Sequence, residues 1–257
     1  WLQDSVAGGV PDQMVISLKG RSSVFKKELM LYEMLAQSNF KRPMYIAITV
    51  GSDNYGRLGD YFVKEGMANR ITPYNTAKNG NVLDPEKCYD NLMHRYKYGG
   101  LKDRELYIDE NAMRMCWGHR QLFAQTALEL IKRGETDKAK ELIAKCEKEI
   151  PEFNVPYVWR SGAVELGKAM MLTGNTKRGE YVLNKAATEC TQYLRWYQSL
   201  SASDLASYRY EYSDCLAILQ NIMATYRSLK SPKEKEVEKT LYHYYELWQS
   251  KTGIDLF

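Results

Sequence analysis

Several signals of chemistry and targeting are scarce or missing in this sequence of 257 residues. No apolar run approaches the ~18 residues that a membrane-spanning helix needs, and we recognise no signal peptide. The formal charge of +4 is small, and basic residues alternate with acidic ones, as in residues 233–239. This mixing is typical of a solvated helix face and argues against nucleic acid as a partner.

Motifs for metal binding and catalysis are also missing. The three histidines lie far apart, and none has a His, Cys or carboxylate partner at ligand spacing. There is no Gly-x-Ser-x-Gly elbow and no cysteine beside a plausible base. Acid pairs such as Asp109 and Glu110 stand at predicted helix starts, where capping explains them. We therefore expect no catalytic residue, no metal and no cofactor in this chain.

The cysteines do not form a disulfide or zinc pattern. They are odd in number and have no Cys-x-x-Cys spacing: Cys88, Cys116, Cys146, Cys190 and Cys215. Most fall in predicted helices, where a free thiol behaves as a small hydrophobic side chain. This pattern predicts buried thiols and leans toward a reducing compartment.

Two segments that begin at Gly134 and Gly174 resemble each other at an interval of forty residues. Small and large residues match where two helices would touch; the equivalent pairs are Ala139 and Gly179, Ile143 and Leu183, and Cys146 and Ala186. With a glycine at the turn and Pro151 closing the first copy, this is similar to a tetratricopeptide repeat. We expect helical hairpins at about 120–153 and 160–193, in which Gly167 and Gly179 allow a close helix crossing.

The first eighty residues have a different character. Short apolar runs there alternate with helical spacing, which predicts the order β-α-β-α-β and a small α/β unit with parallel pairing. The predicted strands are 14–18, 44–50 and 69–74, and the predicted helices are 24–37 and 58–65.

Capping residues mark where the later helices begin. Asp84 and Pro85 predict one helix start, and Ser231 to Glu234 fit a capping box with proline at the first helical position. The fold class that follows is α+β, mostly α. A small α/β unit at 12–80 precedes a tetratricopeptide-like helical repeat domain at 84–251, which would form an α-α superhelix.

The loop from Gly51 to Asp60 is one candidate binding site. It follows a predicted strand and precedes a predicted helix, the context of a phosphate-binding loop, but it fits neither the P-loop nor the G-x-G-x-x-G pattern. Arg57 could meet an anion, Asp53 could orient a hydroxyl, and Tyr55 lies between them. The alternative is a glycine-rich connection shaped only by its turns.

Aromatic residues supply the other candidates. Twenty tyrosines and five tryptophans concentrate at 193–212 and 242–248. A tyrosine combines a flat apolar face with a polar tip, which suits sugars and peptides. Tyr197 and Tyr208 are the candidate binding residues, against the alternative that these rings fill helix–helix contacts, which we favour.

A resemblance adds to this. Residues 41–50 (Lys-Arg-Pro-Met-Tyr-Ile-Ala-Ile-Thr-Val) and 58–71 resemble the soluble C-terminal region of a family of large bacterial multi-span membrane proteins of unknown function. That family looks related to the protein O-mannosyltransferase-like, lipid-sugar-using glycosyltransferases. The resemblance implies that the catalytic acid lies in a membrane portion absent here and that the chain is tethered on the extracytoplasmic (periplasmic) side. The start at Trp1 also suggests a piece of a longer protein.

These observations predict a non-catalytic interaction domain that presents or binds a polypeptide or glycan acceptor beside a membrane glycosyltransferase-like enzyme. One alternative is a free-standing helical-repeat scaffold for protein–protein interaction, with a cytoplasmic location. Another is a ligand-binding or enzymatic domain that uses the Gly51–Asp60 loop. The partner, the sugar and the oligomeric state stay open.

Overall fold

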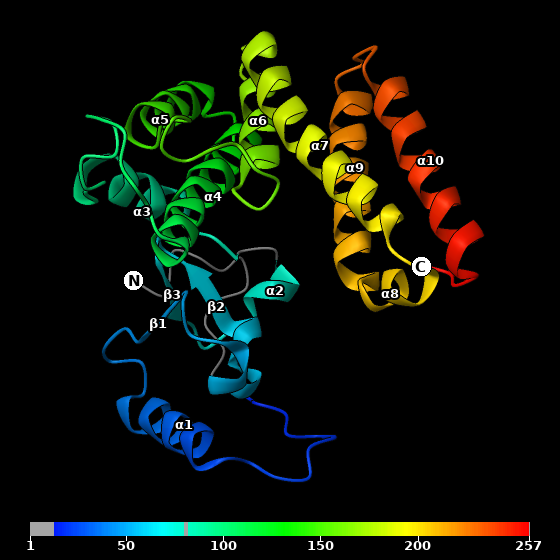
Figure 1. Ribbon diagram of the computed structural model, residues 1–257. Helices are drawn as coiled ribbons and strands as arrows, with labels where there is room; N and C mark the ends of the chain where they lie inside the picture. The colour runs from blue at the N-terminus through cyan, green and yellow to red at the C-terminus, as the bar shows by residue number, and fades with distance from the viewer. Residues whose placement is uncertain (1–12, 80–81, 257) are drawn as a thin grey trace. The chain divides into compact units, whose positions relative to one another are not determined.

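The computed structural model describes residues 13–79 and 82–256, which form a mostly helical protein with one small β-sheet (Figure 1). They divide into two compact units, one ending at Tyr96 and the other beginning at Lys97. The predicted fold class, α+β and mostly α, is confirmed. The domain limits 12–80 and 84–251 stay a prediction, and their ends at 12 and 80 lie outside the described residues.

The first unit is built around a three-stranded sheet in the order β1-β3-β2. Its strands are β1 (Tyr45–Ala47), β2 (Phe62–Lys64) and β3 (Ala68–Ile71). Both pairings are antiparallel, so the predicted parallel pairing is wrong. Only a tight turn at Gly66, with φ of 124°, joins β2 to β3. A parallel pair would need a crossover of about a dozen residues or more.

Helices and turns surround this sheet. They are α1 (Lys26–Ser38), the 3₁₀ turns η2 (Ser52–Asn54) and η3 (Gly56–Tyr61), α2 (Thr76–Asn79), α3 (Pro85–Asp90) and the π-helical turn η4 (Asn91–Arg95). The predicted helices at 24–37 and after Asp84 are confirmed. The Asp84 side chain accepts a hydrogen bond from the Lys87 amide at 3.1 Å, and Pro85 opens the helix as expected.

Two other predicted elements of this unit are wrong. Residues 13–18 form no strand, because Met14 and Ile16 pack on the core without a strand partner. The helix predicted at 58–65 is instead η3 followed by β2. Leu58 and Phe62 have helical spacing, yet both are buried in the same cluster with Leu35. Residues 62–64 instead pair with β3. The helical spacing of this short run was therefore overridden by contacts with another strand.

The second unit consists of helices joined mostly by short turns, with a longer connection at residues 150–162 between α5 and α6 (Figure 1). They are α4 (Glu110–Lys132), α5 (Thr136–Glu149), α6 (Ala163–Leu172), α7 (Thr176–Ser199), α8 (Ala202–Ser207), α9 (Arg209–Ser228) and α10 (Glu234–Thr252). The predicted hairpins are α4 with α5 and α6 with α7, and each pair packs together. Gly134 and Gly174 stand at the turns with φ of 82° and 95°, where glycine is the residue that fits without strain.

The two hairpins bury the same positions. All six matched second-helix residues, from Ala139 to Ala186, are buried. The α6–α7 crossing is the closer one, since a Cβ on Gly179 would lie 2.6 Å from the Gly167 carbonyl oxygen. The helical hairpins are therefore confirmed, and their assignment to the tetratricopeptide class stays a prediction.

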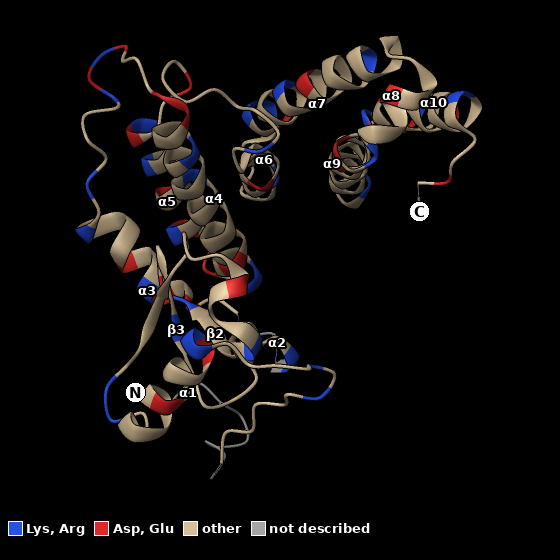
Figure 2. Ribbon diagram, turned by 60° about the horizontal axis from the view of Figure 1, so that its bottom comes forward, with Lys and Arg blue, Asp and Glu red and all other residues tan. Residues whose placement is uncertain are grey.

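The C-terminal helices share one core. Trp248 and Tyr244 of α10 pack against Leu194 of α7 and Leu216 of α9. The helix start predicted at Ser231 is displaced: α10 begins at Glu234, and the Ser231 hydroxyl lies 3.4 Å from the Lys233 amide. Basic and acidic residues are interspersed along the described helices (Figure 2).

Candidate interaction surface

The loop that carries Asp53, Tyr55 and Arg57 is fastened to the region of α1. Lys27 Nζ donates to Asp53 Oδ2 at 3.4 Å and to Asn54 Oδ1 at 3.0 Å. Arg57 Nη2 donates to the Lys19 carbonyl at 3.4 Å. The Tyr55 ring packs on Phe62, with 4.9 Å between ring centroids.

The three candidate side chains of this loop therefore face different neighbours. Asp53 is largely exposed and Arg57 is exposed, whereas Tyr55 belongs to the edge of the core. Gly56 has φ of 56°, and a Cβ there would lie 2.5 Å from Glu28 Oε1 and 2.6 Å from the Tyr32 hydroxyl. Packing against α1 accounts for this glycine, and a ligand role for the loop stays a prediction.

The other two candidates, Tyr197 and Tyr208, come together in the second unit. Their ring centroids lie 5.3 Å apart. Trp196 contacts both rings, at 5.0 Å from Tyr197 and 5.7 Å from Tyr208. Tyr193 stacks on Tyr197 at 6.4 Å. We call these four residues, Tyr193, Trp196, Tyr197 and Tyr208, the aromatic cluster.

Exposure divides the aromatic cluster into a base and a surface. Tyr197 is only 6% exposed and continues into the core through Tyr212 and Trp248. Trp196, Tyr193 and Tyr208 are 49%, 44% and 38% exposed. Tyr197 thus acts as a packing residue that holds the surface rings, and Trp196, which sequence reasoning missed, is the most exposed of them. Its spacing from Tyr193 along one helix was the available signal.

Charged groups lie beside the aromatic cluster. Burial is the main cause that raises the pKa of Tyr197 to about 12; Glu211 adds to this rise and Arg160 opposes it. The Arg160 guanidinium also stacks over the Trp159 ring at 4.2 Å. The Trp159 amide donates to Glu189 at 2.8 Å. A flat apolar surface bordered by a guanidinium and carboxylates can stack on a ring or an apolar side chain and bond to its polar groups.

Two buried ionic groups were missed by sequence reasoning. Glu65 accepts hydrogen bonds from Tyr45 at 2.7 Å, from Lys87 at 2.8 Å and from Arg70. Burial raises the pKa of Glu65, but these hydrogen bonds outweigh it and leave the pKa below its ordinary value. Glu65 lies in the turn after β2, and Arg70 lies on β3 opposite Val63, so no cross-strand spacing in the sequence marked this ion pair.

Arg120 is the other buried group. Its guanidinium donates to the carbonyls of Pro156 at 2.9 Å, Ile150 at 3.1 Å and Val155, and it stacks on the Tyr157 ring at 4.5 Å. Arg120 therefore holds the segment between α5 and α6. Arg120 lies on the same face of α4 as apolar residues. This helical spacing was the sequence signal that its side chain is buried.

The described residues were also compared with the patterns of a metal site and of a membrane-spanning helix. Within residues 13–79 and 82–256, no three His, Cys, Asp or Glu side chains are grouped so as to hold a metal ion. In the same part of the chain, no helix is long and apolar enough to cross a membrane.

Comparison with known proteins concerns the first unit. Residues 2–88 match the family model described as TMEM260-associated domain 2. The match covers about a third of the chain and ends inside α3. No curated protein and no solved structure matches the chain.

Proposed function

We propose that this chain is a non-catalytic, extramembrane part of a larger membrane glycosyltransferase-like protein and that it binds a polypeptide or glycan acceptor. The family match of residues 2–88 supports an association with a TMEM260-type protein. The resemblance to the glycosyltransferase-related family supports an extracytoplasmic location. By holding an acceptor near a membrane active site, the chain would raise its effective concentration there.

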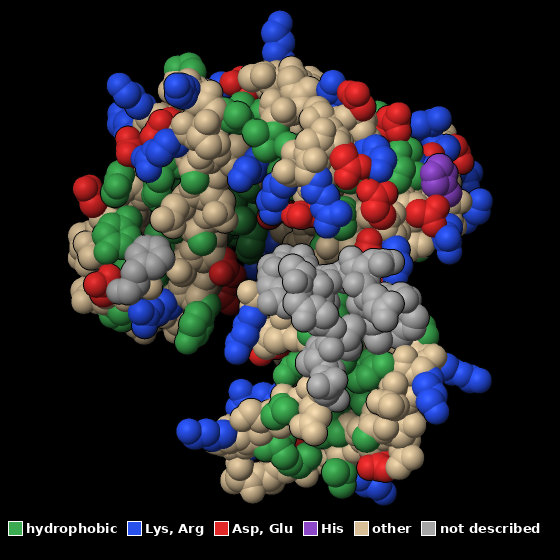
Figure 3. Space-filling view, turned by 180° about the vertical axis from the view of Figure 1, so that it is seen from behind, with side chains coloured by type: hydrophobic (Ala, Val, Ile, Leu, Met, Phe, Trp, Pro, Cys, Tyr) green, Lys and Arg blue, Asp and Glu red, His purple; other side chains and the backbone are tan. Residues whose placement is uncertain are grey.

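The surface of the first unit is consistent with a place inside a larger protein. Leu29, Met30 and Met34 on α1, and Phe25 just before it, are each more than half exposed. Hydrophobic side chains also lie at the surface of the part that holds α1 (Figure 3). Exposed apolar side chains that gather on one element can mark a contact surface, which favours a packing partner for α1 in a larger protein.

The observation that carries the binding proposal is the aromatic cluster. Three of its rings are exposed on a rigid base, and Tyr197 holds them at fixed separations. A preformed aromatic surface costs little conformational entropy on binding, because its side chains are already fixed. Aromatic residues are also enriched among those that dominate binding energy.

Binding to immobilised oligosaccharides and peptides, measured with Trp196→Ala and Tyr208→Ala, tests this proposal. We expect affinity to fall about tenfold for Trp196→Ala, as for a central aromatic contact. Tyr210→Ala is the matched control, since Tyr210 in the first turn of α9 is an exposed ring outside the cluster. Equal affinity of all three variants and the unchanged protein would contradict the proposal.

A further inference from the structure

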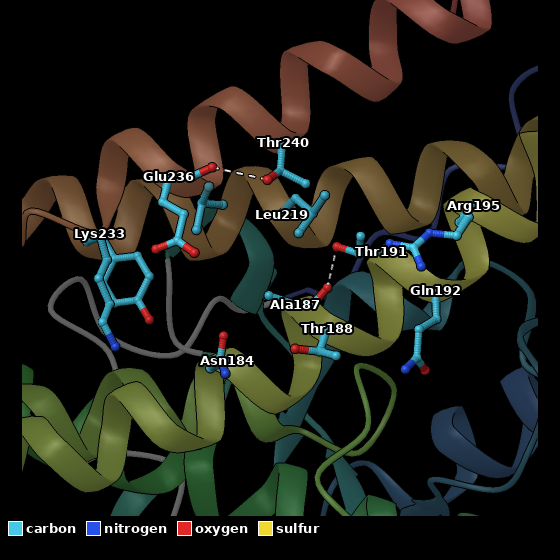
Figure 4. Close-up of a pocket in the computed structure, with 12 residues that line it drawn as sticks. Asn184, Ala187, Thr188, Thr191, Gln192, Arg195, Leu219, Lys233, Glu236 and Thr240 are labelled. Atoms are coloured by element: carbon cyan, nitrogen blue, oxygen red, sulfur yellow. Dashed lines mark hydrogen bonds between the residues drawn. The ribbon is translucent and has the colours of Figure 1, made fainter.

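A groove runs between α7 and α10, and α9 forms its floor (Figure 4). Its volume is about 560 Å³, which lies within the usual range of ligand-binding pockets in proteins. Asn184, Thr188 and Arg195 of α7 border one side, and Glu236 and Thr240 of α10 border the other (Figure 4). We call it the α7–α10 groove.

The polar groups of the α7 wall form a straight stripe. Asn184, Thr188, Thr191 and Arg195 follow each other at intervals of four, three and four residues, which places them on one face of the helix. Steps of four residues along a helix cover about 6 Å. Two residues of an extended chain cover about 6.6 Å, so the stripe nearly matches alternate residues of an extended peptide.

The free hydrogen-bonding capacity of the walls is substantial. Among the described residues, the side chains of Asn184, Thr188, Arg195 and Glu236 have no hydrogen-bond or ion-pair partner. Thr191 and Thr240 donate to the carbonyls four residues before them and keep their lone pairs for a ligand. The end near Lys233 is closed by the ion pair of Lys233 with Glu180 at 3.0 Å.

The floor argues against a sugar in this groove. Leu219 and Tyr226 are 1% and 2% exposed, so neither offers an open face on which a sugar ring could stack. Burial raises the pKa of Tyr226 to about 12, so its phenol is protonated at neutral pH. An apolar helix face would fit no better, since it would leave the amide and carboxylate groups of both walls without partners.

We infer that the α7–α10 groove binds an extended polypeptide segment of about five residues, since the stripe from Asn184 to Arg195 is about 16 Å long. An extended backbone carries N–H and C=O groups along both edges, so both walls can bond to it. The charged residues of the groove also determine which side chains the peptide must carry. An acidic side chain of the peptide meets Arg195, and a basic one meets Glu236 toward the Asn184 end of the groove (Figure 4). This groove is a second site, independent of the aromatic cluster.

Selection from a degenerate library of nine-residue peptides on the full chain tests this inference. We expect the selected peptides to share one acidic and one basic residue about four positions apart. N-methylation of alternate backbone amides in such a peptide should lower its affinity about tenfold, because backbone hydrogen bonds carry the binding.

Protein variants locate the site. Asn184→Ala should weaken peptide binding about fivefold, and Arg195→Glu should weaken it more and be rescued by exchanging the peptide's acidic residue for lysine. Asn221→Ala is the matched control, an exposed asparagine of α9 outside the groove, and it should bind as the unchanged protein does. All of these positions are exposed, so melting temperatures should stay unchanged.

Several outcomes overturn the inference. They are a library without binders, equal weakening by Asn184→Ala and Asn221→Ala, and selected peptides without the charge pair. Binding of an oligosaccharide that Asn184→Ala abolishes, with no peptide bound, would assign the groove to a glycan instead. Loss of aromatic-cluster binding in Trp196→Ala leaves this inference standing, because that variant leaves the groove residues in place.

Discussion

In the first unit, a single carboxylate, that of Glu65, pairs with a buried guanidinium. Glu65 neutralises Arg70, and both side chains are almost fully buried. Arg70 stands on β3, and the Asn91 amide group donates to the Glu65 carbonyl at 2.6 Å. The Glu65 backbone thus joins the turn to η4, while its carboxylate pairs with Arg70.

We predict that Glu65→Gln lowers the free energy of unfolding by about 3 kcal/mol at neutral pH, because it removes the carboxylate charge that pairs with the buried Arg70. The folded-state pKa of Glu65 lies below its ordinary value. Its stabilisation is therefore complete above the unfolded-state pKa and is lost as pH falls through the folded-state pKa. Chemical denaturation from about pH 7 to pH 3 should show the difference between the two proteins shrinking at the acid end.

Glu33→Gln is the control for this prediction. Glu33 is exposed on α1 and accepts a hydrogen bond only from Gln37 at 2.7 Å, among the contacts of the described residues. Its substitution should change stability little at any pH. A Glu65→Gln difference that stays constant with pH would rule out the ionic role of Glu65.

At the scale of the element, sequence reasoning succeeded for long periodic segments and failed for short ones. The helices with sustained apolar spacing, such as α4 and α10, were predicted because many turns repeat one signal. The strand β2 has three residues, and its pairing is made with Asn69, Arg70 and Ile71 of β3. Such contacts lie outside any local window.

The candidate binding residues, too, were predicted only in part from local sequence. Tyr197 and Tyr208 were predicted together from local composition, and they do touch. Which ring would be exposed depended on how α7 packs against α9, so Tyr197 was chosen although it is buried, and Trp196 was missed. The α7 stripe from Asn184 was missed too, because a polar helix face is the usual solvated surface until a second helix is placed across from it.

The α6–α7 crossing gives a prediction at this scale. Gly179→Ala would place a Cβ 2.4 Å from Met171 Cγ and 2.6 Å from the Gly167 oxygen. We expect a loss of about 1–2 kcal/mol, since overpacking outweighs the gain in helix propensity. Thermal unfolding should show a melting temperature lower by a few degrees.

Gly167→Ala provides the comparison. Its Cβ would lie 2.8 Å from Leu183 Cγ and 3.0 Å from the Gly179 carbonyl oxygen, which is less close than the contacts at Gly179, so we expect a smaller loss than for Gly179→Ala. If Gly179→Ala proved more stable than the unchanged protein, the close approach of the two backbones at this crossing would be refuted.

At the scale of the whole molecule, the burial of the cysteine thiols can be compared between the two units. Cys88, Cys146, Cys190 and Cys215 are buried, and Cys116 is partly buried. Burial raises the pKa of Cys116, which lowers the reactive thiolate fraction. Enclosed thiols react slowly with reagents in solution, and Cys190 and Cys215 lie within hydrogen-bond reach of each other.

We predict that a thiol reagent such as dithionitrobenzoate reacts slowly with the native chain, at about one site, and with all five cysteines after unfolding. Cys116→Ser should remove the native reaction. Fast reaction of several thiols in the native chain would instead mean that one of the two units opens readily.

The continuous row of rings from the surface to the core has an optical consequence. Trp196 lies half in water at the outer end of the row, and Trp248 lies fully enclosed at its inner end. Indole fluorescence shifts to shorter wavelength when water is excluded, so a molecule that covers Trp196 would report its own arrival without any label. A Trp196→Phe variant, which keeps the other four tryptophans, should lack this shift.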